Sequence, residues 1–91
     1  MITTKHLRIT GKVQGVGFRA GMYREAVRVN VTGWVRNRDD GSVEAVIQRP
    51  EKSIAEMLAW VKCRPVGAKV EQVEVKNADG IFPDFDLLPT V

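Results

Sequence analysis

The sequence contains few of the residues that cross-link small proteins. It has one cysteine, Cys63, and one histidine, His6, among 91 residues. A single cysteine cannot form a disulfide within the chain, and one cysteine with one histidine is short of the four ligands that a structural zinc site usually takes. Disulfide scaffolds and zinc modules are therefore excluded, and we expect the packing of apolar side chains to stabilise the fold.

Long apolar segments are also absent. The first residues contain no apolar stretch of the roughly 7 to 15 residues that a signal peptide needs, and no later run is long enough to span a membrane. We therefore expect a cytoplasmic protein without a membrane partner. The net charge of +3 suits an anionic ligand but is too small to indicate nucleic acid.

The composition is that of one small globular domain. Hydrophobic residues make up 44% of the 91 residues and charged residues 27%. A chain of this length buries only about 60 to 65% of its unfolded surface, which is enough for one compact core. We therefore expect a single domain over residues 1–91 and a monomer.

The spacing of apolar residues predicts alternating strands and helices. Residues 5–13 alternate as a half-buried strand, and the apolar positions from 18 to 29 recur every three or four residues, which predicts a helix ending at Asn30. Residues 33–37 and 42–48 flank an Asp-Gly turn and predict a hairpin. A second helix has Pro50 in its first turn, residues 70–76 form a strand, and residues 77–91 form a loop with an edge strand.

This order of elements, β-α-β-β-α-β, defines the expected fold class. It predicts an α+β protein with a ferredoxin-like βαββαβ sandwich, in which two helices lie on one face of a mainly antiparallel sheet. Such a fold supports many functions, so the function has to be argued from the residues of a site.

A glycine-rich loop between the first strand and the first helix is the first candidate site. The segment reads Gly11-Lys-Val-Gln-Gly15-Val-Gly17-Phe-Arg19. Its glycines let the backbone N–H groups converge, and the helix that follows adds the positive end of its dipole. The guanidinium of Arg19 could bind two phosphate oxygens. The segment therefore predicts a site for an oxyanion, with a plain strand-to-helix turn as the alternative.

The same loop also matches a dinucleotide-binding pattern. Residues 15–20 satisfy G-x-G-x-x-A, and Asp39 and Asp40 lie downstream. A dinucleotide fold, however, needs its second strand to lead into another helix, whereas here the Asp-Asp-Gly turn leads into a strand. We therefore disfavour dinucleotide binding.

Other polar residues carry weaker signals. Asn37 ends the second strand, where its amide could orient a water molecule or could bond to the backbone of the turn. Asp39 and Asp40 are expected to serve the turn and face water. His6 lies on the polar side of its strand, and Cys63 has no evident base near it.

Two stretches together, Gly11–Arg19 and Gly33–Val43, resemble the two signatures of the acylphosphatase family. The resemblance runs over nearly the whole chain and weakens after about Asn77. It implies a ferredoxin-like enzyme that hydrolyses the carboxyl–phosphate bond of small acyl phosphates to a carboxylate and inorganic phosphate. It also implies that Asn37 positions the attacking water, and that the phosphate is bound by Arg19 and by the loop residues Gln14, Gly15, Val16, Gly17 and Phe18.

The sequence departs from that family at three positions where glycine is usual. These positions hold Arg49, Arg64 and Asp84, and they lie at turns and near the last strand. The departures leave Arg19 and Asn37 in register with the signatures. Because no cluster of acidic or histidine residues is visible, we expect activity without a metal or other cofactor.

Two other functions stay open at this point. The chain could be a noncatalytic module that binds an anion or RNA, although the central hairpin offers only Trp34 for stacking on bases. It could also be a domain of a larger carbamoyl-transfer protein, with carbamoyl phosphate as the ligand. We expect nucleic acid not to be a partner.

Overall fold

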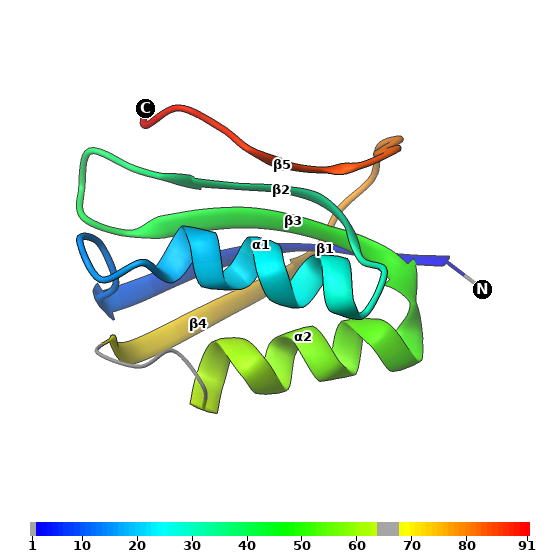
Figure 1. Cartoon of the computed structure of the whole chain (residues 1–91), viewed down its shortest axis with the longest axis horizontal. Helices are drawn as coiled ribbons and strands as arrows, with labels where there is room; N and C mark the ends of the chain where they lie inside the picture. Colours follow the sequence, from blue (N-terminus) through cyan, green and yellow to red (C-terminus); the bar gives the residue numbers. More distant parts are fainter. Residues whose placement is uncertain (1, 64–67) are drawn as a thin grey trace.

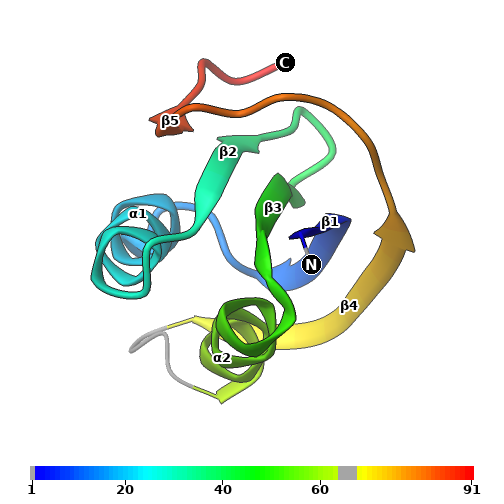
Figure 2. The ribbon, with the colours of Figure 1, turned by 90° about the vertical axis from the view of Figure 1, so that its right-hand side faces the viewer.

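The computed structural model describes residues 2–63 and 68–91, and it shows two helices packed on one side of a curved sheet (Figure 1). The elements are β1 (Ile2–Lys12), α1 (Phe18–Arg28), β2 (Thr32–Asn37), β3 (Val43–Pro50), α2 (Glu51–Cys63), β4 (Lys69–Asn77) and β5 (Phe85–Leu87). Seen from one end, both helices lie inside the curve of the sheet (Figure 2). The predicted ferredoxin-like α+β architecture is therefore confirmed.

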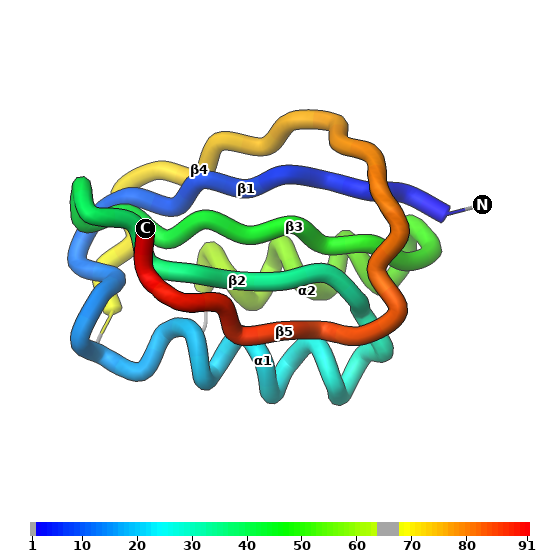
Figure 3. The backbone as a smooth tube through the Cα atoms, turned by 90° about the horizontal axis from the view of Figure 1, so that it is seen from above, coloured from blue at the N-terminus to red at the C-terminus, as the bar shows by residue number. Residues whose placement is uncertain are grey.

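The sheet is mainly antiparallel, as predicted. Its strands lie in the order β4-β1-β3-β2-β5, which Figure 3 shows from above. β1 is antiparallel to both β3 and β4, and β2 is antiparallel to β3. The short strand β5 pairs with β2 in parallel and forms the edge expected in the tail. This pairing brings the last part of the chain beside the end of β2.

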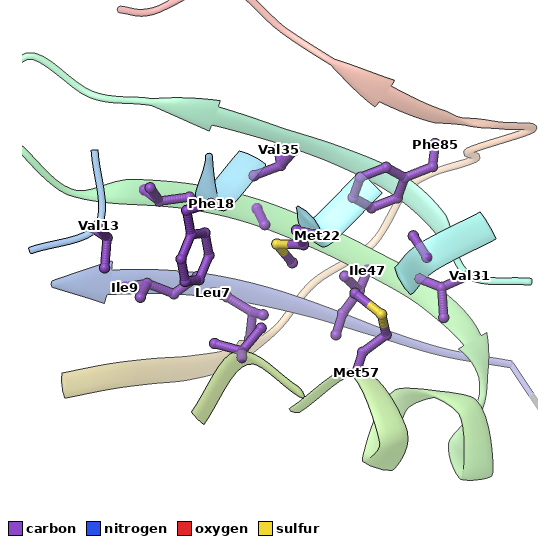
Figure 4. Close-up of a cluster of buried hydrophobic side chains, with 14 of the residues drawn as sticks. Leu7, Ile9, Val13, Phe18, Met22, Val31, Val35, Ile47, Met57 and Phe85 are labelled. Atoms are coloured by element: carbon purple, nitrogen blue, oxygen red, sulfur yellow. The ribbon is translucent and has the colours of Figure 1, made fainter. Parts of the chain in front are cut away.

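The hydrophobic core lies between the sheet and the two helices (Figure 4). Alternate residues of the strands point toward the helices, and every third or fourth residue of each helix points back. Fully buried members include Leu7, Ile9, Val35, Ala45, Ile47, Met22, Ala26, Met57 and Val61. Phe18, the first residue of α1, is also buried, so the core fixes where this helix begins. The start of α1 is thereby held against the sheet.

Most predicted boundaries are close to those observed, with one correction at Pro50. This residue ends β3, where it pairs with Ile2, and α2 begins at Glu51. Proline is tolerated there because the end of a strand does not require its missing N–H. Asn30 has the left-handed conformation expected after a helix, with φ 59°.

The structure describes two of the three positions at which the sequence lacks an expected glycine, Arg49 and Asp84. The Arg49 guanidinium donates a hydrogen bond to the carbonyl of Asn30, so it joins β3 to the segment between α1 and β2. The carbonyl of Asp84 accepts a hydrogen bond from the N–H of Gly33 at 2.9 Å. Arg64 lies outside the described residues. Within residues 2–63 and 68–91, no helix is long and apolar enough to cross a membrane.

Candidate active site

A cavity of about 250 Å³ lies where the chain passes from β1 into α1. The loop that enters α1 and the turn between β2 and β3 lie at the same end of the molecule (Figure 1). The structure therefore brings Arg19 and Asn37 together although they belong to different elements. The cavity is lined by Val13, Gly15, Gly17, Phe18, Arg19, Ala20, Asn37 and Leu87.

The backbone of the loop requires glycine at two positions. Gly15 has φ 73° and Gly17 has φ 76°, in the left-handed region that other residues avoid. A Cβ added to either glycine would meet no atom within 4 Å, so conformation rather than space selects glycine here. Within the described residues, no backbone carbonyl accepts a hydrogen bond from the N–H groups of residues 15–20. These donors are available to an anion.

The start of α1 adds positive charge to the same place. The helix has 11 residues, Gly17 caps it without a side-chain hydrogen bond, and its first turn holds no acidic residue. Its dipole is therefore not neutralised at this end. Arg19 forms no ion pair or hydrogen bond with the described residues, whereas Arg8, Arg36 and Arg38 all pair with carboxylates. The Arg19 guanidinium is therefore free to bind an anion in the cavity.

Asn37 faces the cavity because strand residues alternate between the two faces of the sheet. Val35 is buried on the helix side, and Asn37 follows it on the same side. The buried Oδ1 atom of Asn37 has no hydrogen-bond partner among the described residues. Such an atom is rare in folded proteins and indicates a place for water or a ligand. The Oδ1 atom therefore accepts no hydrogen bond from the turn, which was the alternative interpretation of Asn37.

Gln14 and Val16 differ from the other loop residues that the sequence predicts as phosphate ligands. Neither lines the cavity. The side-chain Nε2 of Gln14 donates hydrogen bonds to the carbonyls of Arg38 at 2.7 Å and Ser42 at 2.9 Å. Val16 packs partly buried against the core. Phosphate binding by these two residues stays a prediction.

The carboxylate of Asp40 has the role in the turn that the sequence predicts, and Asp39 and Asp40 are both exposed. Asp40 Oδ1 accepts hydrogen bonds from the N–H of Ser42 at 2.9 Å and from its hydroxyl at 2.6 Å. These bonds and the Arg8 guanidinium hold the pKa of Asp40 well below its usual range. The N–H of Asp39 donates to the carbonyl of Val91 at 2.7 Å. The turn beside Asn37 is therefore held by several bonds.

A charge cluster occupies the sheet face that the helices leave open. The carboxylate of Glu44 accepts hydrogen bonds from His6 Nε2 at 2.7 Å, Arg36 Nε at 2.8 Å and Arg38 Nη1 at 2.9 Å. The His6 side chain is thus 32% exposed and bonded to this carboxylate, not only a surface residue. Glu44 thus binds Arg36 and Arg38, the residues on either side of Asn37, on the sheet face opposite to the cavity.

The carboxylate of Glu44 makes the free energy of unfolding depend on pH. Burial favours its neutral form, but the bonds from His6, Arg38 and Arg36 outweigh burial and lower its pKa from 4.5 to about 2. A lowered pKa stabilises the fold above the unfolded value and loses that effect as the pH falls through the folded value. We therefore expect Glu44→Gln to lower the free energy of unfolding by about 1 to 3 kcal/mol at neutral pH.

Urea denaturation measures this effect. The difference in unfolding free energy between Glu44→Gln and the unsubstituted protein should shrink between pH 4.5 and about 2, where Glu44 itself becomes protonated. An equal difference at neutral and acidic pH would contradict the assigned ion cluster.

Sequence reasoning missed the contribution of the tail to the cavity. Leu87 belongs to β5, is 49% exposed and lines the cavity with Val13 and Ala20. Parallel pairing of β5 with β2 places Leu87 opposite Val35. The apolar patch near residues 85–88 was the available signal, but nothing local to it indicates which strand it joins.

Two alternative functions can be compared with this geometry. β2 leads into β3 and not into a helix, which confirms the argument against a dinucleotide fold. On the open face, the Arg36 guanidinium lies 4.8 Å from the centre of the Trp34 ring. One face of the only aromatic ring in the central hairpin is therefore covered. This arrangement is unlike an exposed platform for stacking bases.

The fold and the cavity define a ferredoxin-like protein with a concave site at the start of α1. A sequence model described as acylphosphatase matches residues 5–87. Acylphosphatase of Pyrobaculum islandicum is 54% identical over 89 residues, covering 94% of each chain. That of Thiobacillus denitrificans is 51% identical over 83 residues, covering 91% of this chain and 93% of the relative. An acylphosphatase structure from Coxiella burnetii has a TM-score of 0.90 and 33% identity, covering 96% of this chain and 93% of that one.

The chain therefore belongs to the acylphosphatase family. It is an enzyme that hydrolyses acyl phosphates to a carboxylate and inorganic phosphate. The comparisons support this activity and not the noncatalytic alternative.

Proposed function

We propose that the cavity at the start of α1 is where the acyl phosphate is hydrolysed. The observation that supports this proposal is that Arg19, Asn37 and the two loop glycines, Gly15 and Gly17, line the same cavity. In this proposal, Arg19 and the N–H groups of residues 14–18 bind the phosphoryl oxygens. Asn37 orients the water that attacks phosphorus.

The chemistry of the substrate explains why so few groups suffice. An acyl phosphate is a mixed anhydride whose leaving carboxylate is stable at neutral pH, because a carboxyl group has a pKa of about 4 to 5. No general acid is needed to protonate it. Phosphoryl transfer proceeds through a loose transition state with charge on three equatorial oxygens, so positioning and electrostatic stabilisation are the main tasks. In this proposal the loop N–H groups and Arg19 stabilise the charge, and the Asn37 amide positions the water.

The proposed reaction needs no further protein group to accept a proton or to bind the leaving group. The water oxygen forms a bond to phosphorus in line with the breaking bond between phosphorus and the acyl oxygen. The electron pair of that bond leaves with the carboxylate. In this scheme a phosphoryl oxygen takes the proton of the water, and Asn37 holds the water through its amide.

This proposal includes catalysis without a metal ion. Among the described residues, no three His, Cys, Asp or Glu side chains are grouped so that they could hold a metal ion. We therefore expect the rate of phosphate release from acetyl or benzoyl phosphate to survive thorough treatment with EDTA. A colorimetric phosphate assay before and after chelation tests this expectation. A large loss that magnesium restores would contradict the proposed site.

Three further expectations from the sequence stay predictions. They are the cytoplasmic location, the monomeric state and the lack of a nucleic-acid partner.

A further inference from the structure

Gln14 joins the glycine-rich loop to the turn between β2 and β3. Its Nε2 atom donates to the carbonyl of Arg38 at 2.7 Å and to that of Ser42 at 2.9 Å. A carboxamide has only two N–H donors, so this side chain has both of them engaged within the protein. Phosphate oxygens need donors. The Gln14 side chain in this arrangement therefore has none to offer to the substrate.

The carbonyls that Gln14 binds are the ones that close the turn. The N–H of Arg38 donates to Ser42 O at 2.9 Å, and the N–H of Gly41 donates to Arg38 O at 3.1 Å. Arg38 directly follows Asn37 in the chain. A bond to this carbonyl therefore constrains the peptide next to the proposed water-orienting residue.

No other hydrogen bond joins these two segments in the part of the chain that the structure describes. The backbone of Asn37 is also bonded to Val91, through the Val91 N–H at 3.2 Å. That bond connects Asn37 to the tail, and it does not connect it to the loop that would hold the phosphoryl group. Gln14 is thus the polar link between residues 13–17 and residues 38–42.

We propose that Gln14 is a positioning residue that fixes the distance between Asn37 and the loop that holds the phosphate. This inference rests on the proposed roles of Arg19 and Asn37. Attack in line requires the water and the phosphorus atom to be held at a defined separation, and a displacement of about 1 Å can cost 10²-fold in rate. Gln14 therefore acts on the rate of attack, while the affinity for phosphate depends on Arg19 and the backbone N–H groups.

Gln14→Met tests the proposal, because methionine keeps the length of the side chain and removes both donors. We expect kcat with benzoyl phosphate to fall about tenfold, less than for a full loss of alignment. The inhibition constant of inorganic phosphate should change by less than about twofold, because the loop and Arg19 remain. Equal losses in kcat and phosphate affinity would overturn the proposal, since they would assign Gln14 to the shape of the anion site.

Gln48 supplies a matched control on the same sheet. Its Nε2 also donates two hydrogen bonds, to Thr4 Oγ1 at 2.8 Å and to Gly80 O at 2.8 Å. It pairs with Thr32, at the end of β2 opposite to Asn37. Gln48→Met therefore removes the same type of contact far from the cavity, and kcat should not change. A loss of kcat equal to that of Gln14→Met would show a general effect of stability and overturn the inference.

A double variant separates this inference from the role of Asn37 itself. If Gln14 acts through Asn37, adding Gln14→Met to Asn37→Ala should cause no further loss of kcat. Independent, multiplying losses would overturn the role of Gln14 while leaving that of Asn37 in place. If Asn37→Ala alone kept full activity, the proposed role of Asn37 would fail first. Should Gln14→Met not fold, Gln14→Asn repeats the test with a side chain too short to reach both carbonyls.

Discussion

Asn37→Ala is expected to lower kcat for acyl phosphate hydrolysis by about 10²-fold or more, the scale for losing the alignment of a reacting atom. The buried Oδ1 of Asn37 has no partner among the described residues, so removing it breaks no described side-chain bond. The effect should therefore fall on the attacking water. Competitive inhibition by inorganic phosphate should stay near its original strength, because Arg19 and the loop are unchanged.

Steady-state kinetics with benzoyl phosphate measure both quantities. Asn77→Ala is a matched control, because Asn77 also ends a strand but its Oδ1 accepts a hydrogen bond from Lys5 at 2.6 Å on the surface. That variant should keep kcat. A comparable weakening of phosphate inhibition in Asn37→Ala would assign Asn37 to phosphate binding.

Asn37→Asp distinguishes orientation of the water from removal of its proton. Aspartate is the better proton acceptor, but it adds negative charge beside the phosphoryl group. If Asn37 orients the water, this variant should be at least as impaired as Asn37→Ala. Retained activity that titrates near a carboxyl pKa of about 4 would show that proton removal limits the rate and that the phosphoryl oxygen is not the acceptor.

The fold could be predicted from the sequence because local patterns agree with the final packing. Alternation in β1, the helical spacing of Phe18, Met22 and Ala26, and the Asp-Gly turn each specify an element without reference to the rest of the chain. Local patterns do not decide whether Pro50 ends β3 or begins α2, since proline suits the first turn of a helix and also the end of a strand. Pairing with Ile2 decides between them, and that pairing is not local.

The site was only partly predictable for the same reason. Arg19 and Asn37 could be proposed because their residue types and signatures are local. The contacts of Gln14 with the turn, and the position of Leu87 beside the cavity, depend on which segments meet in the folded chain. β2 and β5 are far apart in the sequence, so no local pattern predicts that they pair.

Arg19→Ala is expected to weaken both the binding of inorganic phosphate and the turnover of acyl phosphates. The guanidinium should contact oxygens that carry charge in the ground state and in the transition state. A charge-assisted hydrogen bond contributes about 1.5 to 3 kcal/mol, which corresponds to roughly 10- to 150-fold in affinity. Because Arg19 has no partner among the described residues, its loss should leave the fold intact.

Arg24 provides the control for this experiment. It lies on the exposed side of α1, it does not line the cavity, and like Arg19 it forms no ion pair within the described residues. Arg24→Ala removes the same charge from the same helix, so it separates a local contact from the net charge of the protein. Phosphate inhibition and kcat/KM should stay close to their original values in this variant.

Arg19→Lys then tests the geometry of the contact. Lysine keeps the positive charge but lacks the planar fork that binds two oxygens at once, so it should restore phosphate binding only in part. Binding can be followed by titration calorimetry with inorganic phosphate and compared with kcat/KM in the same buffer. The two losses should run in parallel across Arg19→Ala and Arg19→Lys, because one guanidinium serves both the bound state and the transition state. Unchanged phosphate affinity in a folded Arg19→Ala variant would move the anion site away from the start of α1.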